Sequence, residues 1–290
     1  MKRYILRITY AAIFMFTITQ LGAMNWPTRD AVLTRNFGWN NMGRPVLGMV
    51  FLGGTEVLAA EAGEIIFSRR AGDTASRLPS PLGSWTAVDH GNGLISIYSR
   101  YSEQANPGST NVQRQQPIAR SGASGWSDRE GFYFMLFDRQ ERSWINPAML
   151  ITPVQNHLPF QILGINLINA QGVQLSGAQL QNLSQGRHRI TVATTDNIPR
   201  TGANFLAPYR IIASINGIEV GTLNFESIFA RDGILMVQRN GLVPVQQIYS
   251  PFPAFEVADV FLSRGQASLE IIIQDIAGNT RRSLIQMIIN

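Results

Sequence analysis

Short apolar runs, separated by glycine-containing turns, follow one another between residues 36 and 150. The clearest runs are residues 57–60, 65–67, 86–89 and 94–98. Gly63 separates the first two, and a Gly-Asn-Gly sequence at residues 91–93 separates the last two. An Asn-Gly pair between two apolar runs is the strongest short-range signal for a β-hairpin. This part of the chain is therefore predicted to form antiparallel β-structure.

From residue 160 to residue 290 the apolar runs are longer and often alternate with polar positions. They cover residues 162–168, 189–194, 209–215, 234–237, 257–262, 269–273 and 283–289. The last two are predicted to pair across residues 275–279, a turn whose oxygens could alternatively chelate calcium. About seven strands over about 130 residues are typical of an immunoglobulin-like β-sandwich. The whole pattern thus predicts an all-β protein.

The N-terminus has the regions of an export signal. A basic start is followed by an apolar run at residues 8–21 and by the small residues Gly22 and Ala23. The apolar run is shorter than the roughly 20 residues that a membrane-spanning helix needs. We expect residues 1–23 to be a signal peptide that exports the protein to the periplasm or the exterior, with an uncleaved anchor as the alternative.

The remaining chain is predicted to divide in two. The segment between Thr152 and Pro159 contains two prolines and little periodicity, as linkers do. We therefore expect a first β domain at residues 24–150, a linker at residues 151–159 and the sandwich domain at residues 160–290.

Composition narrows the classes of function. Apolar residues make up 45% and charged residues 15% of the chain, which indicates a folded protein. There is no cysteine, which excludes disulfides, thiolate zinc ligands, a cysteine nucleophile and a lipid anchor on an N-terminal cysteine. Of 24 basic residues three lie in the first 23 positions, so 21 remain against 19 acidic residues. A balance this mild argues against nucleic-acid binding.

Six motifs in the first domain occur in a specific order. They lie at residues 36–38 (Asn-Phe-Gly), 54–66, 88–93 followed by Tyr98, 116–119, 122–125 and 145–147. This ordered set resembles the β-sheet core of the lysostaphin-type (LytM-like) zinc endopeptidases, which cut peptidoglycan cross-bridges. The resemblance covers about residues 36–150 and implies a LytM-like β-sheet core there.

The zinc ligands of that family are missing. Aligned on its Gly-Thr motif, the family's His-x3-Asp pair falls on Arg44 and Gly48, and its His-x-His pair falls on Phe132 and Phe134. A further catalytic histidine falls on Arg100. Glycine and phenylalanine offer no donor atom to zinc, and arginine stays protonated. The sequence therefore predicts a catalytically inactive homologue with no cofactor.

The replacements suggest a remade groove. Phe132 and Phe134 share one face of a strand and could fill the vacated site, while Arg44 and Arg100 could attract carboxylates or be ordinary surface residues. The alternative is that the aromatic residues are core residues, as aromatic residues near a sheet more often are. The candidate binding residues are Arg44, Arg100, Phe132, Tyr133, Phe134 and Trp126.

The three histidines do not have the spacing of metal ligands. We expect His90 to support a turn, His157 to lie in the linker, and His188 to be disfavoured as a ligand by the arginines on either side of it. Asp89 and His90 are adjacent, but the chain lacks the Gly-x-Ser-x-Gly motif of a serine nucleophile.

The function predicted from these features is binding. Several degenerate members of the lysostaphin-type family act as activators of septal amidases. The resemblance therefore implies that the partner is peptidoglycan, or a cell-wall amidase or other hydrolase that the chain regulates. Two alternatives stay open at this point: a zinc-dependent peptidase with non-standard ligands, and a structural envelope protein in which both domains are spacers.

Overall fold

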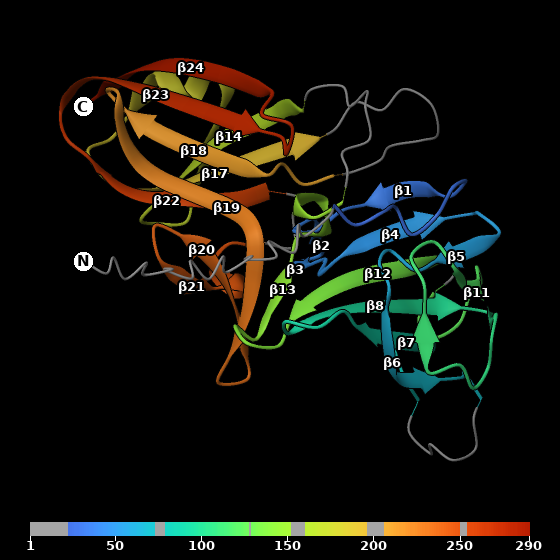
Figure 1. Ribbon diagram of the computed structural model, residues 1–290. Helices are drawn as coiled ribbons and strands as arrows, with labels where there is room; N and C mark the ends of the chain where they lie inside the picture. Colours follow the sequence, from blue (N-terminus) through green and yellow to red (C-terminus); the bar gives the residue numbers. More distant parts are fainter. Residues whose placement is uncertain (1–22, 73–78, 128, 152–159, 196–205, 250–253) are drawn as a thin grey trace, which may run out of the picture.

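The computed structural model describes residues 23–72, 79–127, 129–151, 160–195, 206–249 and 254–290 (Figure 1). All but the last residue of the expected signal peptide, and all but the first residue of the expected linker, lie outside these ranges, so both stay predictions. The described residues form β-strands and three short 3-10 helices. Within these ranges no helix is long and apolar enough to cross a membrane.

The first half of the chain contains strands β1 to β13 and the 3-10 helix η1. Their bounds are β1 (Val32–Arg35), β2 (Asn40–Asn41), β3 (Arg44–Pro45), β4 (Met49–Leu52), β5 (Glu56–Leu58), β6 (Gly63–Arg69), β7 (Ser84–Asp89), β8 (Leu94–Tyr101), β9 (Glu103–Gln104), β10 (Asn111–Val112), β11 (Pro117–Arg120), β12 (Gly131–Asp138), β13 (Ser143–Ile145) and η1 (Pro147–Met149).

The second half contains strands β14 to β24 and two further 3-10 helices. Their bounds are β14 (Gln161–Asn169), β15 (Gln174–Ser176), η2 (Gly177–Gln181), β16 (Asn182–Leu183), β17 (Gly186–Thr195), β18 (Arg210–Ile215), β19 (Ile218–Arg231), β20 (Ile234–Arg239), β21 (Leu242–Pro244), η3 (Val245–Gln247), β22 (Ala254–Leu262), β23 (Gly265–Gln274) and β24 (Thr280–Ile289).

The first half is built on one large antiparallel sheet with a small sheet against one of its faces. The large sheet has the order β10-β6-β7-β8-β12, with β4 beside the first part of β12 and β1 beside β4. The small sheet has the order β5-β11-β9. Strands β7 and β8 form the hairpin predicted around residues 91–93. The runs on either side of Gly63 do not pair with each other, because β5 joins the small sheet and β6 the large one.

The core of the first half lies between these two sheets. Phe51, Tyr98 and Phe134 enter it from the large sheet, and Val57 and Ala119 enter it from the small sheet. Each of the five is at most 1% exposed. Burying a large apolar side chain in this way contributes about 1.5–3 kcal/mol to folding.

The second half is a sandwich of two sheets. One has the order β15-β14-β17-β22, and the other contains β19-β18-β23-β24-β16 (Figure 1). Leu167, Ile190 and Val257 of the first sheet and Ile211 and Ile271 of the second meet in one core, all fully buried. The predicted all-β fold is confirmed. The finer assignment to the immunoglobulin type stays a prediction, which the order β14-β17-β22 opposite β18-β23-β24 supports.

The predicted C-terminal hairpin is present. Strands β23 and β24 pair along their whole length, from Gly265 opposite Ile289 to Gln274 opposite Thr280. The carboxylate of Asp275 accepts hydrogen bonds from the backbone N–H and the side-chain amide of Asn279, both at 2.8 Å. These oxygens close the turn, as the hairpin interpretation of this segment requires.

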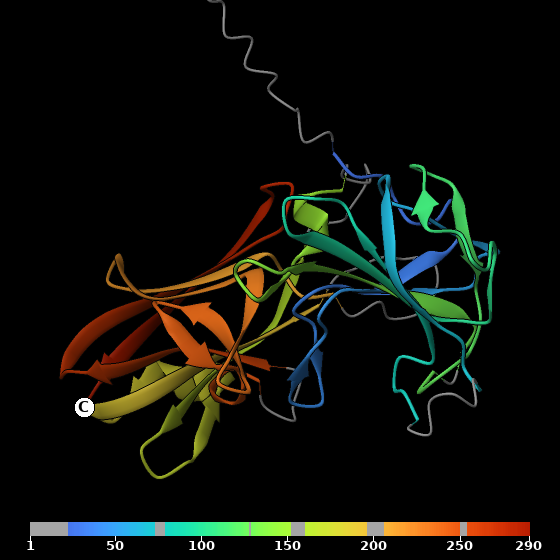
Figure 2. The same ribbon diagram turned by 60° about the horizontal axis from the view of Figure 1, so that its bottom comes forward.

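Strand β19 joins the two halves into one continuous sheet (Figures 1 and 2). It spans 14 residues, pairs with β18 and β20, and also pairs with β13, where Phe229 lies opposite Ser143. This strand is missing from the sequence-based list of strands. A core-facing position of β19 is occupied by Gly221, where a Cβ would lie 2.4 Å from the carbonyl oxygen of Val257. Close packing of two backbones thus removes an apolar side chain from the pattern that would have signalled the strand.

The start of the first half also packs into the sandwich. Phe37 is fully buried in the sandwich core. The carbonyl of Gly38 accepts a hydrogen bond from the Tyr249 hydroxyl at 2.9 Å. The side chain of Asn36 donates to the carbonyl of Ala207 at 2.8 Å and accepts from its N–H at 2.7 Å. These contacts hold the segment before β2 against the second half.

We expect Gly38→Ala to destabilise the protein by about 2–5 kcal/mol. Gly38 has φ +78°, and a Cβ there would lie 2.5 Å from the ring of Phe225. The left-handed backbone costs an alanine about 1–2 kcal/mol, and overpacking adds about 1–3 kcal/mol. The matched control is Gly172→Ala, because Gly172 has φ +81° but open space around it. Urea unfolding measures both, and equal losses of stability would contradict the packing described here.

Candidate functional site

Neighbouring residues of β12 point to opposite faces of the large sheet, and this alternation separates the predicted site residues. Phe132 and Phe134 face the small sheet and are 2% and 0% exposed. Tyr133 and Met135 face the other side, where they pack with Val46 in a separate small cluster. The six residues predicted to line a groove therefore do not share one face.

Phe132 and Phe134 are core residues. The ring of Phe132 stacks on that of Phe51, with centroids 4.8 Å apart and planes 13° apart. The ring of Phe134 lies 5.2 Å from that of Tyr98. Both phenylalanines thus pack between the large and the small sheet and do not line a surface that a ligand could touch.

On the opposite face, Arg100 lies over Tyr133. The guanidinium carbon is 5.0 Å from the centroid of the tyrosine ring, within the range of a cation–π interaction. The Tyr133 hydroxyl accepts a hydrogen bond from the backbone N–H of Leu47 at 2.8 Å. Burial raises the pKa of the Tyr133 hydroxyl, although the charge of Arg100 opposes that shift. The phenol therefore stays protonated and fixed in place.

The backbone of Arg100 explains how its side chain reaches this face. Strand alternation alone would put Arg100 on the same face as Tyr98, which lies in the core between the sheets. Arg100 instead has φ +67°, a left-handed conformation that is uncommon for any residue with a Cβ. Its N–H donates to the carbonyl of Leu82, and its carbonyl accepts from the N–H of Ser124. Two neighbouring loops thus hold the turn of the backbone that delivers Arg100 to Tyr133.

Gly48 points to the same face. A Cβ built on Gly48 would lie 2.1 Å from the carbonyl oxygen of Phe134 and 2.6 Å from Cγ of Met135. The ligands of one metal ion and the catalytic histidine beside it must share a face, so Gly48 and Arg100 indicate that the family's His-x-His pair corresponds to Tyr133 and Met135. We infer that the register assigned from sequence, on Phe132 and Phe134, is displaced by one residue.

Zinc does not fit either register. Gly48 has no donor atom and no space for a side chain, and Arg44 and Arg100 are permanent cations. Tyr133 is protonated and hydrogen-bonded, and the thioether of Met135 is 3% exposed within an apolar cluster. Zinc sites in proteins use histidine, cysteine and carboxylate donors. In the part of the chain that the structure describes, no three such side chains gather at one place.

The two remaining predicted groove residues lie on neighbouring loops. Arg44 is exposed on β3, in the hairpin that continues to Val46 and Leu47 beside Tyr133. Trp126 is 76% exposed, and its N–H donates to the carbonyl of Pro81. Both residues therefore belong to segments that lie beside Tyr133.

Two aromatic residues that sequence reasoning missed lie on the same face. Strand register places Trp85 opposite Ser99 and Ser99 opposite Tyr133. Trp85 and Phe67 stack with their ring centroids 4.3 Å apart, and Phe67 is 46% exposed. We call Phe67, Trp85, Ser99, Arg100 and Tyr133 the aromatic face. Phe67 belonged to a predicted strand, but no sequence signal distinguishes an exposed phenylalanine from a core one.

His90 closes the β7–β8 hairpin. Its Nδ1 lies 2.8 Å from the carbonyl oxygen of Ala62 and its Nε2 lies 2.7 Å from Oγ of Ser96. Ser96 in turn donates to the Tyr98 hydroxyl, which also accepts from the N–H of Ala60 at 2.8 Å. Burial lowers the pKa of His90 and raises that of Tyr98 to about 12. The network ties the hairpin to the small sheet, as the turn-supporting interpretation of His90 requires.

The other candidate groups have structural surroundings. His188 is 2% exposed, and its Nδ1 lies 3.1 Å from the carbonyl oxygen of Gly186. Asp89 accepts a hydrogen bond from the N–H of Gly91 at 2.8 Å and so supports its own turn. His157 lies outside the described residues.

Comparison with protein families identifies the first half. Residues 48–147 match the model of peptidase family M23, which confirms the resemblance predicted from the ordered motifs. Residues 159–290 match a second family model, which carries no description. Among curated proteins no match is found.

Several solved structures are similar to part of the chain. The catalytic domain of the prophage-encoded M23 protein EnpA from Enterococcus faecalis is 18% identical, with 43% of this chain and 95% of that chain covered and a TM-score of 0.37. The catalytic domain of lysostaphin from Staphylococcus simulans is 19% identical, with 38% and 81% covered and a TM-score of 0.33. The SpoIIQ–SpoIIIAH pore-forming complex contains a chain 17% identical, with 45% and 92% covered and a TM-score of 0.37. TM-scores this low carry no conclusion about function.

We expect His90 to make the stability of the protein depend on pH below about 6.5, its ordinary pKa. Because the folded pKa is lowered, the unfolded chain takes up the proton first as the pH falls. Stability is therefore full above that pH and decreases as the pH falls towards the folded pKa. Urea unfolding between pH 5 and pH 7.5 should show this slope in the wild type and a flatter one in His90→Asn. Identical slopes in the two proteins would mean that His90 does not cause this pH dependence.

Proposed function

We propose that this chain is an exported homologue of the M23 peptidases that does not cut peptidoglycan and instead binds it through the aromatic face. The observation that carries the proposal is that the face on which the family's metal ligands and catalytic histidine would lie carries Arg100 over Tyr133, next to the Phe67–Trp85 stack. A metallopeptidase needs a metal-activated water, and the residues on this face cannot hold the metal.

The chemistry of the aromatic face suits peptidoglycan. Sugar rings have apolar C–H faces that can pack on aromatic rings such as the exposed Phe67 and the half-buried Trp85. Stem peptides carry carboxylates, which arginine recognises through paired hydrogen bonds. Arg100 supplies such a group on this face, and Arg69 lies directly opposite Trp85 in the strand register. The face thus combines the two kinds of contact that a glycopeptide requires.

The same surface could instead receive a cell-wall hydrolase that the chain regulates. An aromatic stack beside an arginine is also typical of protein interfaces. Peptidoglycan is preferred because the family to which residues 48–147 match acts on peptidoglycan in its active members, and the large sheet that carries the face is retained. Binding to a hydrolase is the outcome to expect if sacculi are not bound.

The purified chain should contain no stoichiometric zinc and should leave cross-linked peptidoglycan intact. Metal analysis after purification and dialysis against zinc, together with digestion of sacculi, measures both properties. One equivalent of zinc accompanied by cleavage would mean that the metal site has been misassigned and that the protein is a peptidase.

Phe67→Ser and Arg100→Asn should each weaken co-sedimentation with sacculi at least fivefold. The first removes half of the exposed aromatic stack. The second removes the charge and keeps a residue type that tolerates the left-handed backbone at this position. Fivefold corresponds to about 1 kcal/mol, a modest estimate for one such contact.

The matched controls are Ile218→Ser and Arg264→Asn, which change an exposed apolar residue and an exposed arginine of the second half. Both should bind sacculi like the wild type, and thermal unfolding should show that all four variants are folded. Equal binding by the wild type, Phe67→Ser and Arg100→Asn would move the binding site away from the aromatic face.

A further inference from the structure

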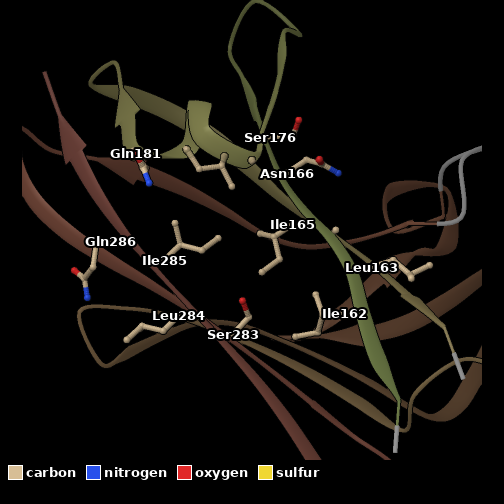
Figure 3. A pocket seen from close by; sticks show the side chains of 13 residues that line it. Ile162, Leu163, Ile165, Asn166, Ser176, Gln181, Ser283, Leu284, Ile285 and Gln286 are labelled. Carbon is tan, nitrogen blue, oxygen red and sulfur yellow. The ribbon is translucent and has the colours of Figure 1, made fainter. Parts of the chain in front are cut away.

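Two pockets among the described residues of the sandwich differ in their linings. One, of about 780 Å³, lies between β14, β24 and η2, and Figure 3 shows Ile165 and Ile285 opposite one another across it. No charged residue lines it. The other, of about 680 Å³, is lined by charged and amide side chains. Its volume is within the range of about 300–1,000 Å³ that is usual for small-molecule sites.

The second pocket, which we call the polar pocket, lies on the outer face of the β15-β14-β17-β22 sheet. Its floor includes Asn166 of β14, Thr191 of β17 and Glu256 of β22, whose neighbours in sequence point inward to the sandwich core. Its wall is formed by Arg239 at the end of β20 and by η3. Rigid strands therefore fix most of the groups that a ligand would meet.

The charges in the polar pocket neutralise one another. The two carboxylate oxygens of Glu256 accept hydrogen bonds from Arg189 and from Arg239, each at 2.9 Å. Asp259 accepts a hydrogen bond from Arg187, also at 2.9 Å. Glu256 and Arg239 are only 15% and 14% exposed in their side chains. An anion would meet the Glu256 carboxylate and a cation would meet two arginines, so the pocket offers little to an ion.

Amide and apolar groups complete the lining. Gln246 and Gln247 of η3 are exposed, and each carries both a donor and an acceptor. Ile168, which is half-buried, adds apolar surface. The combination suits a neutral ligand that both donates and accepts hydrogen bonds and also has apolar C–H patches.

We propose that the polar pocket binds a short neutral glycan. A pyranose ring has hydroxyl groups that donate and accept at once, which match the alternating carboxylate, guanidinium and amide groups of the pocket. Phe261 extends the same sheet face two residues beyond Asp259 and is 67% exposed. Its ring gives the apolar face of the next sugar a surface to pack on.

The proposal is tied to the proposed function only in the choice of sugar, because the glycan strands of peptidoglycan contain N-acetylated amino sugars. A tetramer of N-acetylglucosamine, free of peptide, is therefore the probe. Calorimetric titration of the whole purified chain measures its Kd, and sedimentation with sacculi is measured on the same samples.

The wild type should bind the tetramer with a measurable Kd, and Gln246→Ala combined with Gln247→Ala should weaken it at least tenfold. These two side chains are exposed, so the double variant is expected to fold. Phe261→Ser should weaken binding of the tetramer more than binding of the dimer. The matched control is Gln185→Ala combined with Gln266→Ala, two exposed glutamines elsewhere in the sandwich, and it should bind like the wild type.

The two proposals can fail separately. Absence of tetramer binding, unchanged binding by the Gln246/Gln247 double variant, or binding of stem peptides alone would overturn the glycan site. If sacculi binding is then still lost in Phe67→Ser, the proposed function stands without the second site. Tetramer binding without any sedimentation with sacculi would uphold the polar pocket and overturn the function.

Discussion

The alternation of side chains along β12 is the constraint on which both the core and the candidate site depend. Phe132 and Phe134 face the small sheet and close the core with Phe51 and Tyr98. The residue between them, Tyr133, is thereby committed to the other face, where Arg100 covers it. A strand has only two faces, so residues that stabilise the sheet from one side cannot also line a groove on the other.

The face of the large sheet around Tyr133 is closely packed. Gly48 leaves no space for a ligand side chain beside β12, and Leu47 holds the Tyr133 hydroxyl through its N–H. Beside this filled region, Phe67 and Trp85 stay stacked at the surface. Through β19 the same sheet continues into the sandwich, where its strand β20 supplies Arg239 to the wall of the polar pocket. The floor of the pocket belongs to the separate sheet β15-β14-β17-β22.

Much of the fold follows from local sequence signals. The hairpin around residues 91–93, the hairpin of β23 and β24 and the ordered motifs of the first half all depend on turns and alternation, which are local. Contacts between distant segments were not predictable. The burial of Phe37 in the sandwich core and the pairing of β13 with β19 depend on how the halves meet. The sequence does not fix the register of the His-x-His pair, because Phe132, Tyr133 and Phe134 are all aromatic and only geometry distinguishes their faces.

Contact between the aromatic face and the ligand can be measured directly, because the chain contains no cysteine and an introduced thiol can be labelled by itself. Phe67→Cys introduces a single thiol on that face, and Ile218→Cys introduces one on an exposed position of the second half, 71% exposed in the wild type. The rate at which a thiol reagent labels each variant is measured with and without soluble peptidoglycan fragments. We expect the fragments to slow the labelling of residue 67 and to leave the labelling rate of residue 218 unchanged. If residue 67 were labelled at the same rate with saturating fragments as without them, the aromatic face would not be the binding site.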